Sequence, residues 1–178
     1  MRRNAVRAIF CYAYEPGHLR DGGFAVNVFS NDMLSFTAFD TRRNPIGECA
    51  FVLPRGTAQR MIRSIKEADG WLWNFPPRMS FKDNPDHVST IGLDGYPLFR
   101  LEDFQMMATL NEFRSTRGHY AREMMNLIEE IAALLDSCGF RLTLRSFTWL
   151  SDIQPVPAPP LPASDAEAGE EERRTRIG

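Results

Sequence analysis

Three histidines and three cysteines are the residues of this chain best suited to metal binding or nucleophilic chemistry. They are His18, His87, His119, Cys11, Cys49 and Cys138. The sequence contains no HxH or HExxH motif and no CxxC pair, and those are spacings at which such residues bind zinc. It also lacks the GxxxxGK[ST] loop that cradles phosphates. We therefore expect no metal site and no cofactor, and we assign no catalytic residue.

The cysteines indicate a reducing compartment. An odd number of cysteines at wide spacings does not form the disulfide framework of a small secreted domain. The apolar run near the N-terminus is short and meets Glu15-Pro16 without a cleavage pattern, so we expect no signal peptide. No apolar stretch reaches the roughly 18 residues that suggest a membrane span. We expect a cytoplasmic protein with no membrane contact.

Acidic and histidine side chains in predicted loops give an enzymatic alternative. A hydrolytic or nuclease-like site would draw on Asp94, Glu102, Asp103, His87 and His119. Catalytic residues often come from loops that are distant in sequence, so spacing alone does not exclude such a site. The alternative requires at least two of these side chains to meet in one cleft.

Aromatic residues next to prolines form the first candidate binding feature. The segment WLWNFPP begins at Trp71 and contains Trp73 and Phe75. Aromatic side chains at a rigid edge are typical of interface anchors, whereas the same rings also serve to fill the open end of a sheet. We expect Trp71 in the core and take Trp73 and Phe75 as candidate binding residues.

Arginines form the second candidate binding feature. Arg60 and Arg63 lie on a predicted helix, and Arg141 and Arg145 share one face of a predicted strand. The strand pair, Arg141 and Arg145, is suited to an acidic partner, although pairing with acids of a neighbouring strand is the common outcome.

The overall charge disfavours a nucleic-acid partner without excluding it. The chain has 21 basic and 23 acidic residues, and residues 1–150 hold 18 and 17 of them. Proteins that neutralise phosphates usually have a basic excess. A local surface would have to combine basic and aromatic side chains, with stacking added to phosphate contacts. The residues proposed for it are Arg42, Arg43, Arg60, Arg63, Lys66 and Trp73.

Strands are predicted for the first third of the chain. The segments 5–14, 24–30, 33–39 and 46–53 are apolar or alternating. Asn31-Asp32 tolerates positive φ and predicts a hairpin turn, and a second turn is expected at 41–45. Asp94-Gly95 predicts a further tight turn within 90–101, which should form one strand or a short hairpin. The first four segments together predict an antiparallel meander of about four strands.

Two amphipathic helices are predicted to cover one face of this sheet. The first has apolar residues at i, i+3, i+4 and i+7 from Ala58 and should end at Asp69-Gly70. The second spans 120–137 and should stop at Gly139. Residues 140–150 alternate and predict a final strand of the sheet, with a phase slip near Ser146 that suggests a bulge. The expected fold class is α+β.

The C-terminal residues differ in composition from the rest. Residues 155–162 read PVPAPPLP, and the following charged segment has a single large apolar residue, Ile177. Such a segment buries too little surface to offset its ordering entropy. We predict one domain over 1–150 and, over 151–178, a polyproline spacer with a disordered charged tail that adds nothing to the core. PAPPLP also resembles polyproline ligands, but a spacer is the simpler interpretation.

These observations give a ranked set of functional hypotheses. The leading one is a non-enzymatic cytoplasmic protein-interaction module whose partner is another protein. Its type would be an inhibitor or adaptor encoded by a bacterium, phage or mobile element against a host defence system. The alternatives are the small enzyme and the nucleic-acid-associated protein described above. The sequence fixes no oligomeric state.

Overall fold

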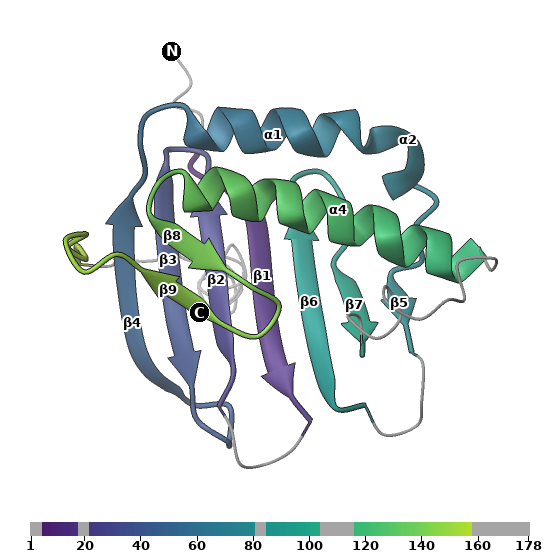
Figure 1. The fold of residues 1–178 in the computed structure, drawn as a ribbon, viewed down its shortest axis with the longest axis horizontal. Helices are drawn as coiled ribbons and strands as arrows, with labels where there is room; N and C mark the ends of the chain where they lie inside the picture. Colours follow the sequence, from purple (N-terminus) through teal and green to yellow (C-terminus); the bar gives the residue numbers. More distant parts are fainter. Residues whose placement is uncertain (1–4, 18–21, 81–84, 104–115, 158–178) are drawn as a thin grey trace, which may run out of the picture.

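A computed structural model of the chain describes residues 5–17, 22–80, 85–103 and 116–157. The fold contains a large sheet, a small hairpin and three named helices (Figure 1). The strands are β1 (Ala8–Pro16), β2 (Phe24–Phe29), β3 (Met33–Phe39), β4 (Pro45–Val52), β5 (Arg78–Met79), β6 (His87–Leu93), β7 (Phe99–Glu102), β8 (Phe140–Leu142) and β9 (Phe147–Trp149). The helices are α1 (Thr57–Glu67), α2 (Asp69–Leu72) and α4 (Thr116–Asp136).

The large sheet has seven strands in the order β4-β3-β2-β1-β6-β7-β5. All neighbouring pairs are antiparallel except β5 and β7. The predicted meander is confirmed by β1 to β4, and its two turns contain Asp32 and Arg43 at φ 61° and 66°. The turn at Asp94-Gly95 joins β6 to β7, so the predicted short hairpin is present. The fold is therefore α+β, as the sequence predicts.

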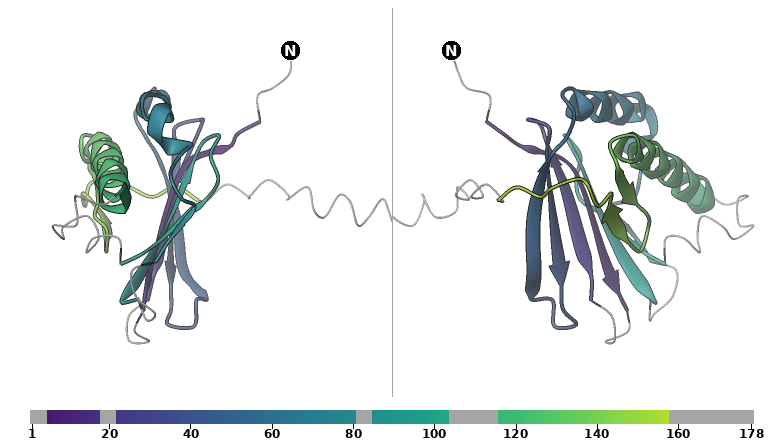
Figure 2. Two further views of the ribbon diagram at one scale, coloured as in Figure 1. Left: turned by 90° about the vertical axis from the view of Figure 1, so that its right-hand side faces the viewer. Right: turned by 60° about the vertical axis from the view of Figure 1, so that its left-hand side comes forward.

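The helices and the small hairpin lie on one side of the large sheet (Figure 2). Strand alternation points Tyr12, Val26 and Ile91 towards the helices, and all three are fully buried. From α1, the core receives Ala58, Met61 and Ile65 of the predicted apolar face. The corresponding buried residues of α4 are Ala121, Met124, Leu127, Ile128, Ile131 and Leu135. One core thus lies between the sheet and the two long helices.

The helix boundaries differ slightly from the prediction. Helix α1 ends at Glu67, and Asp69-Gly70 belongs to the short helix α2 instead of ending the helical run. Gly70 does not adopt the positive φ of a helix-terminating glycine, whereas Gly139, which follows α4, has a φ of 88°. The predicted stop at Gly139 is confirmed.

The prediction for residues 140–150 is wrong in one respect. Two short strands, β8 and β9, replace the single final strand, and they form a separate two-stranded sheet. The phase slip near Ser146 marks a turn, in which the Thr143 N–H donates to the Ser146 carbonyl at 2.9 Å. The Phe147 ring stacks on Phe36 with centroids 5.3 Å apart, so the hairpin packs over the sheet instead of joining it.

The chain keeps a contact with the sheet beyond the predicted boundary at residue 151. Val156 pairs with Ala50 on β4 through hydrogen bonds in both directions, of 2.7 and 3.3 Å. This bridge lies at the β4 edge and not in the core, so the expectation that residues 155–178 add nothing to the core stays a prediction, although the chain still contacts the sheet at Val156. The reason is that this residue, between two prolines, retains a free N–H for an edge strand. The remainder of the predicted spacer and tail, 158–178, lies outside the described residues.

Candidate functional site

Trp73 is the most exposed aromatic side chain among the large apolar residues at the described surface. It follows α2 directly, and 64% of its surface is accessible. The helical turn of α2 directs its neighbour Leu72 into the core, where that side chain is almost completely buried. The short helix therefore fixes the backbone that presents Trp73 to solvent.

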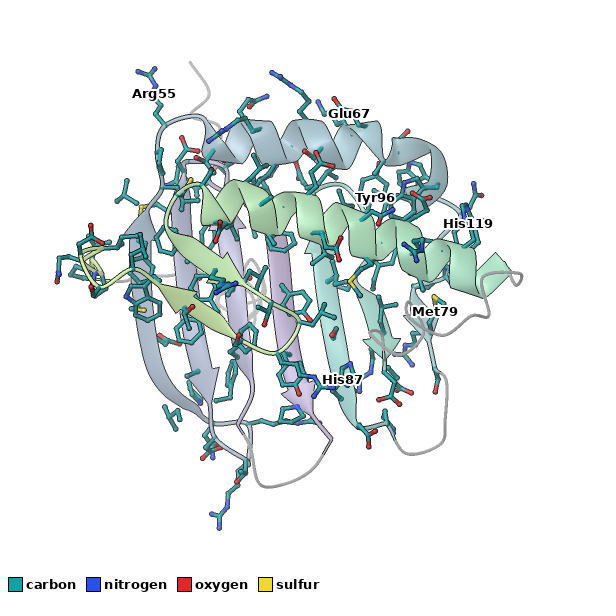
Figure 3. The ribbon with its side chains drawn as sticks, in the orientation of Figure 1. Arg55, Glu67, Met79, His87, Tyr96 and His119 are labelled. Atoms are coloured by element: carbon teal, nitrogen blue, oxygen red, sulfur yellow. The ribbon has the colours of Figure 1, made fainter. Side chains whose placement is uncertain are left out.

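Two contacts hold the Trp73 side chain in one orientation. Its indole Nε1 donates to Asp69 Oδ1 at 2.8 Å, and its ring centroid lies 4.9 Å from that of Tyr96. The Tyr96 hydroxyl donates to the same carboxylate oxygen, which completes a three-residue group. We call Asp69, Trp73 and Tyr96 the Trp73 cluster; Figure 3 shows Tyr96 near the α2 end of the helical layer.

The electrostatics of the Trp73 cluster favour a protonated tyrosine. Burial and the hydrogen bond to the Asp69 carboxylate raise the pKa of Tyr96 to about 12. Removing the phenolic proton would place a second negative charge beside Asp69. The cluster therefore keeps its hydrogen bonds at neutral pH.

Phe75 does not share this surface. Only 4% of the residue is accessible, and its ring meets Phe99 edge-on at 5.2 Å and Tyr120 at 5.9 Å. Trp71 is half-buried and packs against Phe75 at 6.0 Å. Of the aromatic residues singled out in the sequence, the structure thus leaves Trp73 exposed and uses Phe75 as internal support.

The predicted arginines lie on separate parts of the molecule. Arg60 and Arg63 are exposed on α1, where Arg60 Nη2 lies 3.3 Å from Thr57 Oγ1. Arg141 is exposed on β8, and Arg145 is exposed in the turn that follows, so they do not share the single strand face that was expected. Arg42 and Arg43 stand in the β3–β4 turn, at the opposite end of the sheet from α1 (Figure 1). The six residues proposed for a nucleic-acid surface therefore do not form one continuous patch.

Two of the five residues of the enzymatic alternative approach each other. His87 Nδ1 lies 3.6 Å from Asp103 Oδ1, and both side chains are at least 96% buried. Asp103 Oδ1 also accepts the Asp86 N–H at 2.8 Å. Because both side chains are buried, neither the imidazole nor the carboxylate is accessible to a substrate. The distance between Nδ1 and Oδ1 is also longer than an ordinary hydrogen bond.

The other three residues of that alternative are dispersed. Asp94 forms a bidentate pair with Arg7, at 2.9 and 2.8 Å. Glu102 lies 4.0 Å from Arg100, and His119 is exposed at the far end of α4 from the hairpin (Figures 1 and 3). Within the described ranges, no group of three His, Cys, Asp or Glu residues could hold a metal ion.

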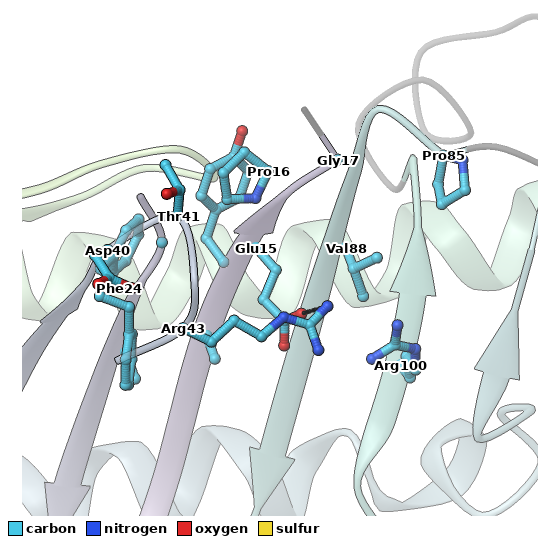
Figure 4. A pocket seen from close by; sticks show the side chains of 15 residues that line it. Glu15, Pro16, Gly17, Phe24, Asp40, Thr41, Arg43, Pro85, Val88 and Arg100 are labelled. Atoms are coloured by element: carbon cyan, nitrogen blue, oxygen red, sulfur yellow. Dashed lines mark ion pairs between the residues drawn. The ribbon is translucent and has the colours of Figure 1, made fainter. Parts of the chain in front are cut away.

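A pocket that the sequence does not indicate lies at the end of the sheet where β1 and β3 finish and β2 and β6 begin. It has a volume of about 420 Å³, and Arg43 reaches across it to Glu15, with 3.0 Å between Nη2 and Oε2 (Figure 4). Glycines give its floor close backbone packing: a Cβ on Gly17 would lie 2.1 Å from the Pro85 carbonyl oxygen. Glycines in the β1–β2 loop were the one feature of the sequence that could have indicated this pocket. Each arginine in this pocket lies beside a carboxylate, so the pocket offers little uncompensated charge.

Comparisons with known proteins add no functional assignment. No protein-family model matches the chain, and no curated protein matches it in sequence. In the part of the chain that the structure describes, no helix is long and apolar enough to cross a membrane.

Proposed function

We propose that this chain is a non-enzymatic protein-interaction module and that Trp73 is its principal anchor. The observation that carries the proposal is the combination of exposure and fixed orientation in the Trp73 cluster. A tryptophan exposed to this extent leaves a large apolar surface in water, which a partner would cover.

The fixed orientation of Trp73 favours tight binding. Side chains that are ordered before binding lose less rotamer entropy when the complex forms. Tryptophan is also among the residues that most often dominate interface energies. Because Asp69 already accepts the indole N–H, the partner need only provide an apolar socket for the ring.

The proposal extends to the type of module. A small inhibitor or adaptor, of the counter-defence kind encoded by bacteria, phages or mobile elements, needs a few anchors and no catalytic group. A cytoplasmic location is part of this proposal. It is supported by Cys11, Cys49 and Cys138, which are all free thiols.

A quantitative pull-down tests this function. The tagged full-length chain is compared with Trp73→Ala and with Leu150→Ala, a matched control whose side chain is 60% exposed and lies beyond β9. Bound proteins from the source cells are measured by mass spectrometry. We expect a stoichiometric protein that the control retains and Trp73→Ala loses by about tenfold or more, as for an interface hot spot. Failure to recover any stoichiometric protein, or equal recovery by all three chains, would overturn the proposal.

A second candidate is nucleic-acid binding through α1. Arg60, Arg63 and Lys66 are all exposed and recur every three residues along that helix. Fluorescence anisotropy with a labelled single-stranded oligonucleotide tests this candidate at low and moderate salt. It predicts an affinity that falls with salt and falls further in Arg60→Ala/Arg63→Ala. An unchanged affinity in that variant removes α1 from consideration.

A further inference from the structure

The face of the large sheet opposite the helices has a regular distribution of charge. Among the described residues, no helix or strand lies over this face (Figure 2). Strand pairing aligns one residue from each strand in a row across it. From the β4 edge to the β5 edge, the row reads Glu48, Thr37, Ala25, Ala13, Thr90, Arg100, Arg78. A negative charge therefore lies at one edge and two positive charges at the other, where Glu102 in the adjacent row lies 4.0 Å from Arg100.

The centre of the face is small and has little uncompensated charge: Glu15, on β1 in the row beyond Ala13, pairs with Arg43 at 3.0 Å. The next row contains Ser35, Asn27, Cys11 and Gly92, again aligned by strand pairing. Leu98, which is 64% exposed, extends this row, since its Cδ2 would lie 3.1 Å from a Cβ on Gly92. Charge depletion in the centre with charged residues at the rim is the usual composition of a protein interface. Small side chains also allow a second sheet to approach to about 10 Å.

We infer that the partner for this face is a second copy of the chain. A two-fold axis parallel to the strands, lying above β1, exchanges the two edges of the sheet. Such an axis places Glu48 of each copy opposite Arg78 of the other and Thr37 opposite Arg100, while Ala13 meets its own counterpart. Two equivalent ion pairs form at the rim, and no charged residue of this row lies in the middle.

The same row selects this orientation over the other symmetric one. A two-fold axis perpendicular to the strands and lying above this row would place Glu48 over Glu48 and Arg78 over Arg78. Like charges in contact disfavour an interface by several kcal/mol. Both axes give the aligned packing that twisted sheets adopt face to face, so the charges of this row are what distinguish them.

The face is large enough for a stable dimer. The strand spacing and the length of the paired region give a footprint of about 30 by 20 Å, or roughly 1,200 Å² in total over both copies. This is at the lower limit of standard interfaces, so we expect a dimer whose population depends on concentration.

Charge reversal tests the dimer. Sedimentation velocity of the full chain over a wide concentration range should show a monomer–dimer equilibrium. Glu48→Arg and Arg78→Glu should each raise the dissociation constant about tenfold or more, because attraction becomes repulsion at both rims. The double variant Glu48→Arg/Arg78→Glu should restore dimerisation. Arg63→Glu on α1 and Glu129→Arg on α4 are control reversals on exposed helix positions and should have no effect.

Thr37 supplies a second test that does not depend on the folding of those variants. Within one copy Thr37 pairs with Glu48, so Thr37→Arg should stabilise the monomer and Thr37→Glu should destabilise it. Across the dimer the residue faces Arg100, so Thr37→Arg should weaken association and Thr37→Glu should strengthen it. These opposite signs separate association from fold stability.

Several outcomes would overturn the inference. These are a wild-type chain that stays monomeric throughout the range, single reversals that dimerise like wild type, or a double variant that remains monomeric with an unchanged circular dichroism spectrum. The inference does not rest on the proposed function, because Trp73→Ala should leave the dimer unchanged. Loss of the protein partner and loss of the dimer are therefore separate results.

Discussion

The carboxylate of Asp32 caps helix α1 from a different element, accepting the Ala58 N–H at 2.7 Å and the Gly56 N–H at 2.8 Å. Gly56 occupies the N-cap position and has no side chain with which to cap the helix. Asp32 also forms the β2–β3 turn with a φ of 61°. One residue thus shapes a hairpin and satisfies the exposed donors of a helix 24 residues later.

We expect Asp32→Ala to lower the free energy of unfolding by about 1–2 kcal/mol, because two helix N–H groups lose their acceptor. Asp32→Asn should cost less, since an amide oxygen still accepts one bond and asparagine tolerates positive φ. Urea unfolding measures both. Asn31→Ala is the neighbouring control, and an equal loss in that variant would show that the turn, and not the cap, carries the effect.

Tyr12 connects the sheet to the small hairpin. Its hydroxyl donates to the Leu144 carbonyl at 2.8 Å and lies 3.0 Å from Ser89 Oγ in the core. Tyr12→Phe should lower the free energy of unfolding by about 1–3 kcal/mol, because buried polar partners are left unpaired. Hydrogen exchange should increase mainly in β8 and β9. Uniform protection changes across the whole sheet would contradict a local connecting role.

Alkaline pH should release the Trp73 cluster. The pKa of Tyr96, raised to about 12 by burial and by Asp69, exceeds the ordinary value of about 10. Between pH ~10 and ~12 the Tyr96 phenol therefore keeps its proton in the folded chain and loses it in the unfolded chain. The contribution of Tyr96 to the free energy of unfolding is complete below pH ~10 and is lost as the pH rises towards ~12. Asp69→Asn should lower the pKa of Tyr96. Tyrosine Cζ chemical shifts measure this pKa, with Tyr96→Phe identifying the signal.

Trp73 fluorescence provides a parallel readout of the same titration. The indole should change its emission as Tyr96 ionises, because the two rings are in contact and share Asp69. A Tyr96 resonance that titrates near pH 10 in both wild type and Asp69→Asn would contradict the arrangement.

Truncation separates two parts of the C-terminal segment. A chain ending at Pro157 should melt within about a degree of the full chain, since the residues removed have a composition that favours few stabilising contacts. A chain ending at Ile153 should melt about 2–4 °C lower, because it loses the two hydrogen bonds between Ala50 and Val156. Equal melting temperatures for both truncations would show that the Val156 pairing contributes nothing.

Periodicity was sufficient for most individual elements. The apolar spacing of Ala58, Met61 and Ile65 predicted the buried face of α1, and Asn31-Asp32 predicted the first hairpin turn. These features are local, because a helix stripe or a turn depends on residues a few positions apart. For residues 140–150 the alternation predicts one strand, because two short strands and one long strand show the same alternation. The phase slip at Ser146 was the local sign of the turn.

Only part of the candidate site could be predicted from the sequence. An aromatic segment near Trp73 was recognisable from composition, but exposure was not: Trp73 and Phe75 are two residues apart, and one is exposed while the other is buried. Tyr96, which fixes Trp73, lies in the β6–β7 turn, and no spacing rule links it to Asp69. The buried approach of His87 to Asp103 likewise depends on how the ends of β6 and β7 align.

The sequence by itself determined the α+β class, the meander, the two amphipathic helices and the separate composition of the C-terminal residues. The tertiary structure alone decided which strands are neighbours, and hence that Glu48 and Arg78 end the same row on opposite edges of one sheet face. The physical reason is range: secondary structure arises from repeating contacts between nearby residues, whereas a surface arises from strand order and register. Strand order and register depend on how the whole core packs.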